Sequence, residues 1–175
     1  MRLLGVVLAG GRSSRFGSDK ALAVYCGRSF LDGAIAALAP LVAEIAVCGR
    51  AHGRLRAIAD RPAPGLGPLG GLNGALAVAL AEGFDAVLSV PCDVPLLDAD
   101  TLRLLIAPDE RPYAFADLPV CGMWPASLAC LLDGRLRSGA PRSAKSWVAA
   151  CAAAVVPGPG LANVNAPEDL ARLPR

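Results

Sequence analysis

The stretch LAGGRSSRFGSDK, residues 8–20, decides the fold that this sequence predicts. It continues an apolar run, residues 3–8, whose length and β-branched content are typical of a buried strand. The adjacent glycines Gly10 and Gly11 would let the backbone turn tightly and bring its N–H groups close to a ligand. Three cations that suit a polyanionic ligand follow: Arg12, Arg15 and Lys20. Because open α/β sheets bind nucleotides where a strand ends in such a loop, we interpret the stretch as a triphosphate-binding loop.

Two common phosphate-binding motifs do not fit this stretch. The P-loop pattern G-x-x-x-x-G-K-[ST] fails because Ser18 and Asp19 separate Gly17 from Lys20. The dinucleotide fingerprint G-x-G-x-x-G fails because the glycines stand at positions 10, 11 and 17. On the residues alone, a surface turn with solvated arginines remains an alternative.

Length and composition indicate one globular domain with a full core. The chain has 175 residues, of which 54% are hydrophobic, and its net charge is only +2. We therefore expect neither nucleic acid nor a membrane as a partner, and no apolar stretch approaches the ~20 residues that cross a bilayer. Six cysteines without a C-x-x-C pair, and a single histidine, exclude zinc-site spacing and predict reduced thiols in a cytoplasmic protein.

The elements expected along the chain alternate between strands and helices. A helix should begin at Ser29, where Asp32 completes an S-x-x-D capping pattern. Further strands are expected at 45–48, 57–59, 86–90 and 120–124, and further helices at 72–81, 127–136 and 143–150. This order predicts an α/β fold, with residues 1–175 forming a single three-layer, Rossmann-like domain around a mostly parallel central sheet.

A second glycine-rich stretch, DRPAPGLGPLGGLNG, covers residues 60–74. It contains a literal G-x-G-x-x-G at Gly65, Gly67 and Gly70. The context of this fingerprint argues against dinucleotide binding. Pro62 and Pro64 separate the fingerprint from the preceding strand, and Pro68 lies inside it. We interpret it as a proline-stiffened loop that ends at the helix expected over 72–81.

Polar residues near the ends of later elements are further candidates for a site. Asp93 directly follows the strand expected at 86–90 and would face the same crevice as the first loop. Near the C-terminus, Asn165 and Glu168 form a capping-box-like pair, whereas capping does not explain Asn163. Four basic residues would form a solvated face, or would hold a substrate phosphate if they border the crevice: Arg135, Arg137, Arg142 and Lys145.

Four motifs in order resemble those of the molybdenum cofactor guanylyltransferases, the MobA-like members of the nucleotidyltransferases. They are L-A-G-G-x-S-x-R-x-G-x-D-K at 8–20, G-P-L-x-G-L at 67–72, P-C-D-x-P at 91–95 and N-V-N-x-P-E-D-L at 163–170. The resemblance covers nearly the whole chain and implies the nucleotide-diphospho-sugar transferase type of the α/β fold. It also implies a reaction that transfers GMP from GTP to molybdopterin and releases pyrophosphate.

The resemblance further implies roles for individual residues. Mg²⁺ would be the cofactor, with Asp93 as its ligand and as a catalytic residue together with Lys20 and Arg15. Asn163 and Asn165 would lie near the metal or the pterin phosphate. The nucleotide would contact Leu8, Ala9, Gly10, Gly11, Lys20, Asp60 and Asp93. Molybdoenzymes or their maturation proteins are the candidate protein partners.

The sequence departs from this family at two places, and other functions stay open. Cys48 stands where the family has a nucleotide-contacting asparagine, and Leu118 replaces the histidine of a histidine-proline pair. A pterin cytidylyltransferase is one alternative, although that group typically opens with L-A-A-G. A non-catalytic nucleotide-binding module in molybdoenzyme maturation is a second alternative. A sugar-phosphate nucleotidyltransferase is a third, but such chains are usually longer.

Overall fold

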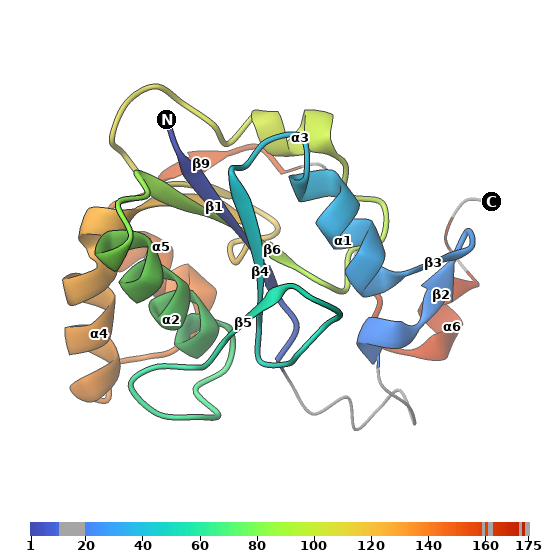
Figure 1. The fold of residues 1–175 in the computed structure, drawn as a ribbon, viewed down its shortest axis with the longest axis horizontal. Helices are drawn as coiled ribbons and strands as arrows, with labels where there is room; N and C mark the ends of the chain where they lie inside the picture. The colour runs from blue at the N-terminus through green and yellow to red at the C-terminus, as the bar shows by residue number, and fades with distance from the viewer. Residues whose placement is uncertain (11–19, 159, 161–162, 172, 174–175) are drawn as a thin grey trace.

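The computed structural model describes residues 1–10, 20–158, 160, 163–171 and 173. Seven strands form its main sheet: β1 (Leu3–Leu8), β4 (Glu44–Cys48), β5 (Arg56–Ile58), β6 (Ala86–Pro91), β7 (Tyr113–Phe115), β8 (Gly122–Pro125) and β9 (Ala154–Val156). They lie in the order β5-β4-β1-β6-β8-β7-β9 (Figure 1). β8 pairs antiparallel with β6 and β7, and the other neighbouring pairs are parallel. The predicted α/β fold with a mostly parallel sheet is confirmed.

Helices cover both faces of this sheet and give three layers (Figure 1). One face carries α1 (Phe30–Leu38) and α3 (Ala99–Arg103), and the other carries α2 (Pro68–Ala81), α4 (Ala129–Arg137) and α5 (Ala144–Ala150). Side chains along β1 alternate between the two cores, because successive residues of a strand point to opposite faces. No helix in the described part of the chain has the length and hydropathy of a membrane span.

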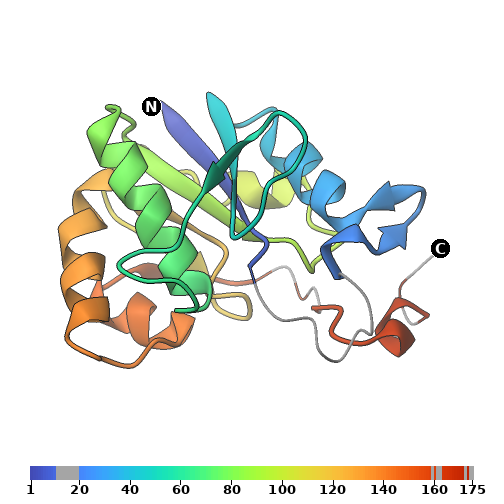
Figure 2. The ribbon, with the colours of Figure 1, turned by 60° about the horizontal axis from the view of Figure 1, so that its bottom comes forward.

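Short elements connect these layers. A 3₁₀ turn, η1 (Lys20–Leu22), leads into a hairpin of β2 (Val24–Tyr25) and β3 (Arg28–Ser29), which precedes α1. A second 3₁₀ turn, η2 (Ala126–Leu128), leads into α4, and α6 (Pro167–Leu170) lies near the C-terminus. Figure 2 shows α6 at the edge of the molecule, on the same side as the hairpin.

The helix beginnings test the predictions made from local patterns. Ser29 caps α1 as predicted, and its Oγ accepts the N–H of Asp32 at 3.0 Å. The helix expected over 72–81 instead begins at Pro68, four residues earlier, with Gly67 as its N-cap. Proline is well suited to the first helical position, where its missing N–H would have no partner in the helix. Gly70 therefore lies inside α2, whereas Gly65 and Gly67 belong to the loop before it.

The carboxyl ends of three neighbouring strands meet at one edge of the sheet. The N–H of Ala9 donates to the carbonyl of Cys48 at 3.1 Å, and the N–H of Cys92 donates to the carbonyl of Leu8 at 3.4 Å. The strand order reverses between β1 and β6, because the chain extends the sheet first through β4 and β5 and later through β6. A crevice at such a reversal is where open α/β sheets bind their ligands.

Candidate active site

Three segments that are far apart in the sequence converge just beyond β6. The ammonium Nζ of Lys20 lies 2.9 Å from Oδ2 of Asp93 and donates to Oδ1 of Asn165, also at 2.9 Å. The side chains of Lys20 and Asp93 are 14% and 21% exposed, so the pair is mostly shielded from water yet still accessible. The structure thus joins a cation, a carboxylate and an amide that the sequence assigned to one site.

The backbone around Lys20 is fixed by short-range bonds. The N–H of Ala23 donates to the carbonyl of Lys20 at 3.1 Å, and the N–H of Phe30 donates to the carbonyl of Ala23 at 2.9 Å. Ala21 is buried in the core on the α1 side of the sheet. The 3₁₀ turn is therefore anchored to the start of α1, and Lys20 extends from a well-packed element.

The carboxylate of Asp93 has one oxygen available for a cation. Its Oδ2 accepts from Lys20, while its Oδ1 is buried and has no hydrogen-bond partner among the described residues. Those residues hold no cluster of three or more His, Cys, Asp or Glu side chains that could bind a metal alone. A divalent cation here would be held by Asp93 together with oxygens of a bound substrate. Mg²⁺ is often held in this way, by one or two carboxylates and substrate phosphates, so the residues present fit that ion.

Gly49, in the turn that follows β4, shapes the end of β1. It has a φ of +89°, and a Cβ built on it would lie 2.5 Å from the Cα of Gly10 and 2.8 Å from its nitrogen. The turns after β1 and β4 therefore touch backbone to backbone, which only glycine permits. Leu8, Ala9 and Gly10 lie at this edge, whereas Gly11 and Arg15 lie outside the described residues.

Asp60 follows β5 and packs against the first turn of α2. Its Oδ2 accepts the N–H of Gly65 at 3.2 Å, and a Cβ on Gly70 would lie 3.1 Å from the same oxygen. Among the described residues, Asp60 makes no bond to Lys20 or Asp93. Its carboxylate instead organises the loop that enters α2.

Cys48 ends β4 between Asp60 and α2. Its thiol is buried and donates to the carbonyl of Gly71 at 3.4 Å. Burial raises the pKa of Cys48 to about 12, and the negative charge of Asp60 adds to this increase. The residue is therefore a neutral packing group that closes the space beneath the first turn of α2.

The structure corrects the predicted role of Asn165. We expected its side chain to cap the last helix, but α6 has Ala166 as its N-cap and the Asn165 amide binds Lys20. The N–H groups of Asn165 and Ala166 are accepted by Oδ2 of Asp169, at 2.8 and 2.9 Å. Asn163 is exposed and forms no hydrogen bond with the described residues. Of the two asparagines, only Asn165 reaches Lys20.

The basic cluster of residues 135–145 is partly used within the protein. Arg135 donates to the carbonyl of Pro141 at 3.3 Å and to Oγ of Ser146 at 3.0 Å, which ties α4 to α5 and to the segment before it. Arg137 pairs with Asp133 at 2.6 Å on the same helix. Arg142 and Lys145 are exposed. The cluster is therefore largely a surface feature of α4 and α5.

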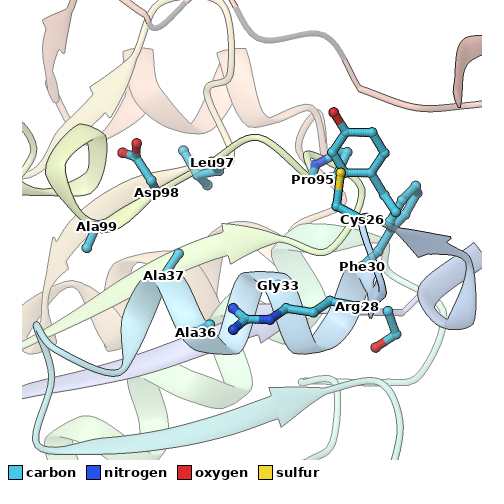
Figure 3. Close-up of a pocket in the computed structure, with 12 residues that line it drawn as sticks. Cys26, Arg28, Phe30, Gly33, Ala36, Ala37, Pro95, Leu97, Asp98 and Ala99 are labelled. Atoms are coloured by element: carbon cyan, nitrogen blue, oxygen red, sulfur yellow. The ribbon is translucent and has the colours of Figure 1, made fainter. Parts of the chain in front are cut away.

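A separate cavity of about 530 Å³ lies between the β2–β3 hairpin, α1 and the segment before α3 (Figure 3). Tyr25, Arg28 and Gly33 line one part of it, and Pro95 and Asp98 line another. Neither Lys20 nor Asp93 is among the lining residues. The site built around Lys20 is thus distinct from this cavity.

Comparisons with known proteins agree with the geometry. Residues 5–154 match the family described as the MobA-like NTP transferase domain. A molybdenum cofactor guanylyltransferase from Sinorhizobium fredii is 37% identical over 194 residues, which cover 97% of this chain and 89% of that protein. The structure of molybdopterin-guanine dinucleotide biosynthesis protein A from Archaeoglobus fulgidus aligns with a TM-score of 0.77 at 19% identity, covering 97% and 95% of the two chains. A Mycobacterium tuberculosis protein solved in complex with manganese aligns with a TM-score of 0.65 at 19% identity, covering 98% and 97%.

Proposed function

This chain belongs to the MobA-like NTP transferases and is therefore a nucleotidyltransferase; from this premise we propose that it transfers GMP from GTP to molybdopterin and releases pyrophosphate. The proposal makes it a molybdenum cofactor guanylyltransferase, like its full-length relatives. The observation that carries it is the meeting of Lys20, Asp93 and Asn165 beside the strand end at Leu8. Recipients of the product would be molybdoenzymes or the proteins that mature them.

The reaction requires two anions to approach each other. A phosphate oxygen of molybdopterin would attack the α-phosphorus of GTP, and the bond from that phosphorus to the bridging oxygen of pyrophosphate would break. Positioning and charge neutralisation supply most of the catalysis in phosphoryl and nucleotidyl transfer. Lys20 is suited to stabilise the charge that grows on the departing pyrophosphate, and Arg15 would assist it.

The remaining polar groups would bind and orient the substrates. Asp93 would hold Mg²⁺, which when bound offsets negative charge on the nucleotide phosphates. Its buried, unpartnered Oδ1 supports this assignment, as does the manganese in the related structure from Mycobacterium tuberculosis. The backbone N–H groups of Gly10 and Gly11 would bind the phosphates, with Leu8 and Ala9 beside them, and Asp60 would contact the nucleoside. Asn163 and Asn165 would face the metal or the pterin phosphate.

Turnover with different nucleotides tests this function. The purified protein would be mixed with Mg²⁺, molybdopterin and either GTP, CTP or ATP, and pyrophosphate release would be measured together with the dinucleotide product. We expect rapid release with GTP and little with the other two. A preference for CTP would instead identify a cytidylyltransferase. Nucleotide binding without pyrophosphate release would identify a binding module and refute the proposed reaction.

A further inference from the structure

The side chain of Asn165 binds Lys20 and does not cap the helix that follows it. Asparagine readily hydrogen-bonds backbone N–H groups a few residues further along the chain, and it is among the preferred residues at helix N-termini. Here its Oδ1 instead accepts from Nζ of Lys20 at 2.9 Å, although α6 begins only two residues later. Another group must therefore accept hydrogen bonds from the backbone N–H groups that the Asn165 side chain does not bind.

Three consecutive N–H groups hold this segment in place. The N–H of Val164 donates to the carbonyl of Asp93 at 2.9 Å, and the Val164 side chain is buried. The next two N–H groups, of Asn165 and Ala166, both donate to Oδ2 of Asp169, at 2.8 and 2.9 Å. The first bond fixes the segment against the end of β6. The other two orient the backbone of Asn165 relative to Lys20.

We propose that Asp169 is a positioning residue for nucleotidyl transfer, which acts by holding the Asn165 amide against Lys20. The inference rests on the proposed function of Lys20. When the Asp169 carboxylate is removed, two backbone donors lose their acceptor, and the side-chain Oδ1 of Asn165 would turn to accept N–H groups at the start of its own helix. Asn165 would then leave Lys20 without this partner, and Lys20 would be less well oriented toward the phosphates.

The variant Asp169→Ala tests this role, with Glu168→Ala as its matched control. Glu168 is the preceding acid on the same short helix, is exposed, and makes no hydrogen bond with the described residues. We expect Asp169→Ala to lower kcat about tenfold, and Glu168→Ala to leave it unchanged. Asp169→Asn retains one acceptor oxygen and should recover part of the loss. An equal loss in Glu168→Ala would show that only the charge or stability of the helix matters.

A double-mutant cycle separates positioning from a purely structural role. If Asp169 acts through Asn165, then Asp169→Ala should lower kcat by less than about twofold when it is added to Asn165→Ala, because the residues act as a unit. A structural role would give losses that multiply in the double variant, and that result would overturn the proposal. Thermal unfolding of each variant would be measured alongside, so that an unfolded protein is not mistaken for an inactive one.

A readout that needs no turnover keeps this inference distinct from the proposed function. In nuclear magnetic resonance spectra of the full chain, the side-chain amide of Asn165 should shift in Asp169→Ala much as it does in Lys20→Ala, and it should stay in place in Glu168→Ala. Such shifts without any GMP transfer by the wild type would refute the function and retain the positioning contact. An unmoved Asn165 amide in Asp169→Ala would refute the positioning role even if the wild type transfers GMP.

Discussion

The ammonium of Lys20 lies 2.9 Å from the carboxylate of Asp93, so the charge of the proposed metal ligand is already neutralised in the free protein. A divalent cation that arrives alone must compete with this ammonium. A cation that arrives with a nucleotide brings phosphates, which can replace Asp93 as the hydrogen-bond acceptors of the Lys20 ammonium. In the proposed function, the pair would therefore couple metal binding to nucleotide binding.

Removing the ammonium should strengthen the binding of metal alone. Lys20→Met retains the bulk of the side chain but removes its charge. Without nucleotide, Asp93 should therefore bind Mn²⁺ about five- to tenfold more tightly, which corresponds to a gain of about 1 kcal/mol in binding free energy. Electron paramagnetic resonance of free Mn²⁺ measures this affinity. Lys145→Met, which changes an exposed lysine outside the site, should have no effect. Unchanged or weaker binding in Lys20→Met would show that the pair does not compete with the metal.

The opposite effect is expected on turnover. Lys20→Ala should lower kcat with Mg-GTP and molybdopterin by roughly 10²–10³, or about 3–4 kcal/mol, as the loss of one transition-state partner does. Pyrophosphate release under saturating substrates would report it. Turnover within a factor of two of the wild type would mean that Lys20 does not face the leaving group.

Asp93→Asn tests the metal ligand itself. The amide keeps the size of the side chain and can still accept from Lys20, but it binds a divalent cation far more weakly than a carboxylate does. We expect Mg²⁺-dependent turnover to be abolished while circular dichroism remains that of the wild type. Full activity would remove Asp93 from the metal site.

Two helical glycines should respond oppositely to the same substitution. A Cβ at Gly74 in α2 would overlap the carbonyl oxygen of Ala59, so Gly74→Ala should lower the free energy of unfolding by about 1–3 kcal/mol. Gly134 in α4 is exposed and has no atom within 4 Å of its Cβ position, so Gly134→Ala should raise that free energy by about 0.5–1 kcal/mol. Urea denaturation measures both. A stable Gly74→Ala variant would show that α2 can move away from β5 at little cost.

Local patterns in the sequence predicted the parts of the fold that depend on near neighbours. The apolar run at residues 3–8 and the capping pair at Ser29 both appear as predicted, because periodicity and capping act within a few residues. Pro68 misled the prediction, since proline interrupts a helix but also begins one. Strands β7 and β9 were not predicted, whereas β5, which is equally short, was expected at 57–59. β7 pairs in parallel with β9, a partner far along the chain that no local pattern indicates.

The sequence indicated which residues belong to the candidate site, but not which contacts they form. The motifs selected Lys20, Asp93 and Asn165, but their hydrogen bonds span 73 and 145 residues of sequence and follow from the sheet topology. The role of Asp169 was missed because the capping-box pattern pairs Asn165 with Glu168, three residues later. In the structure the N-cap is Ala166, one residue further along, so that Asp169 takes the third helical position and accepts the backbone N–H groups.

The backbone contact between Gly10 and Gly49 has a consequence for engineering. Because the two turns are in backbone contact, the path of residues 8–10 depends on Gly49, in a segment distant in the sequence. If only the first loop were grafted from a relative to change nucleotide preference, it would pack against a turn at Gly49 with which it did not evolve. The two turns should be transplanted together, as one unit.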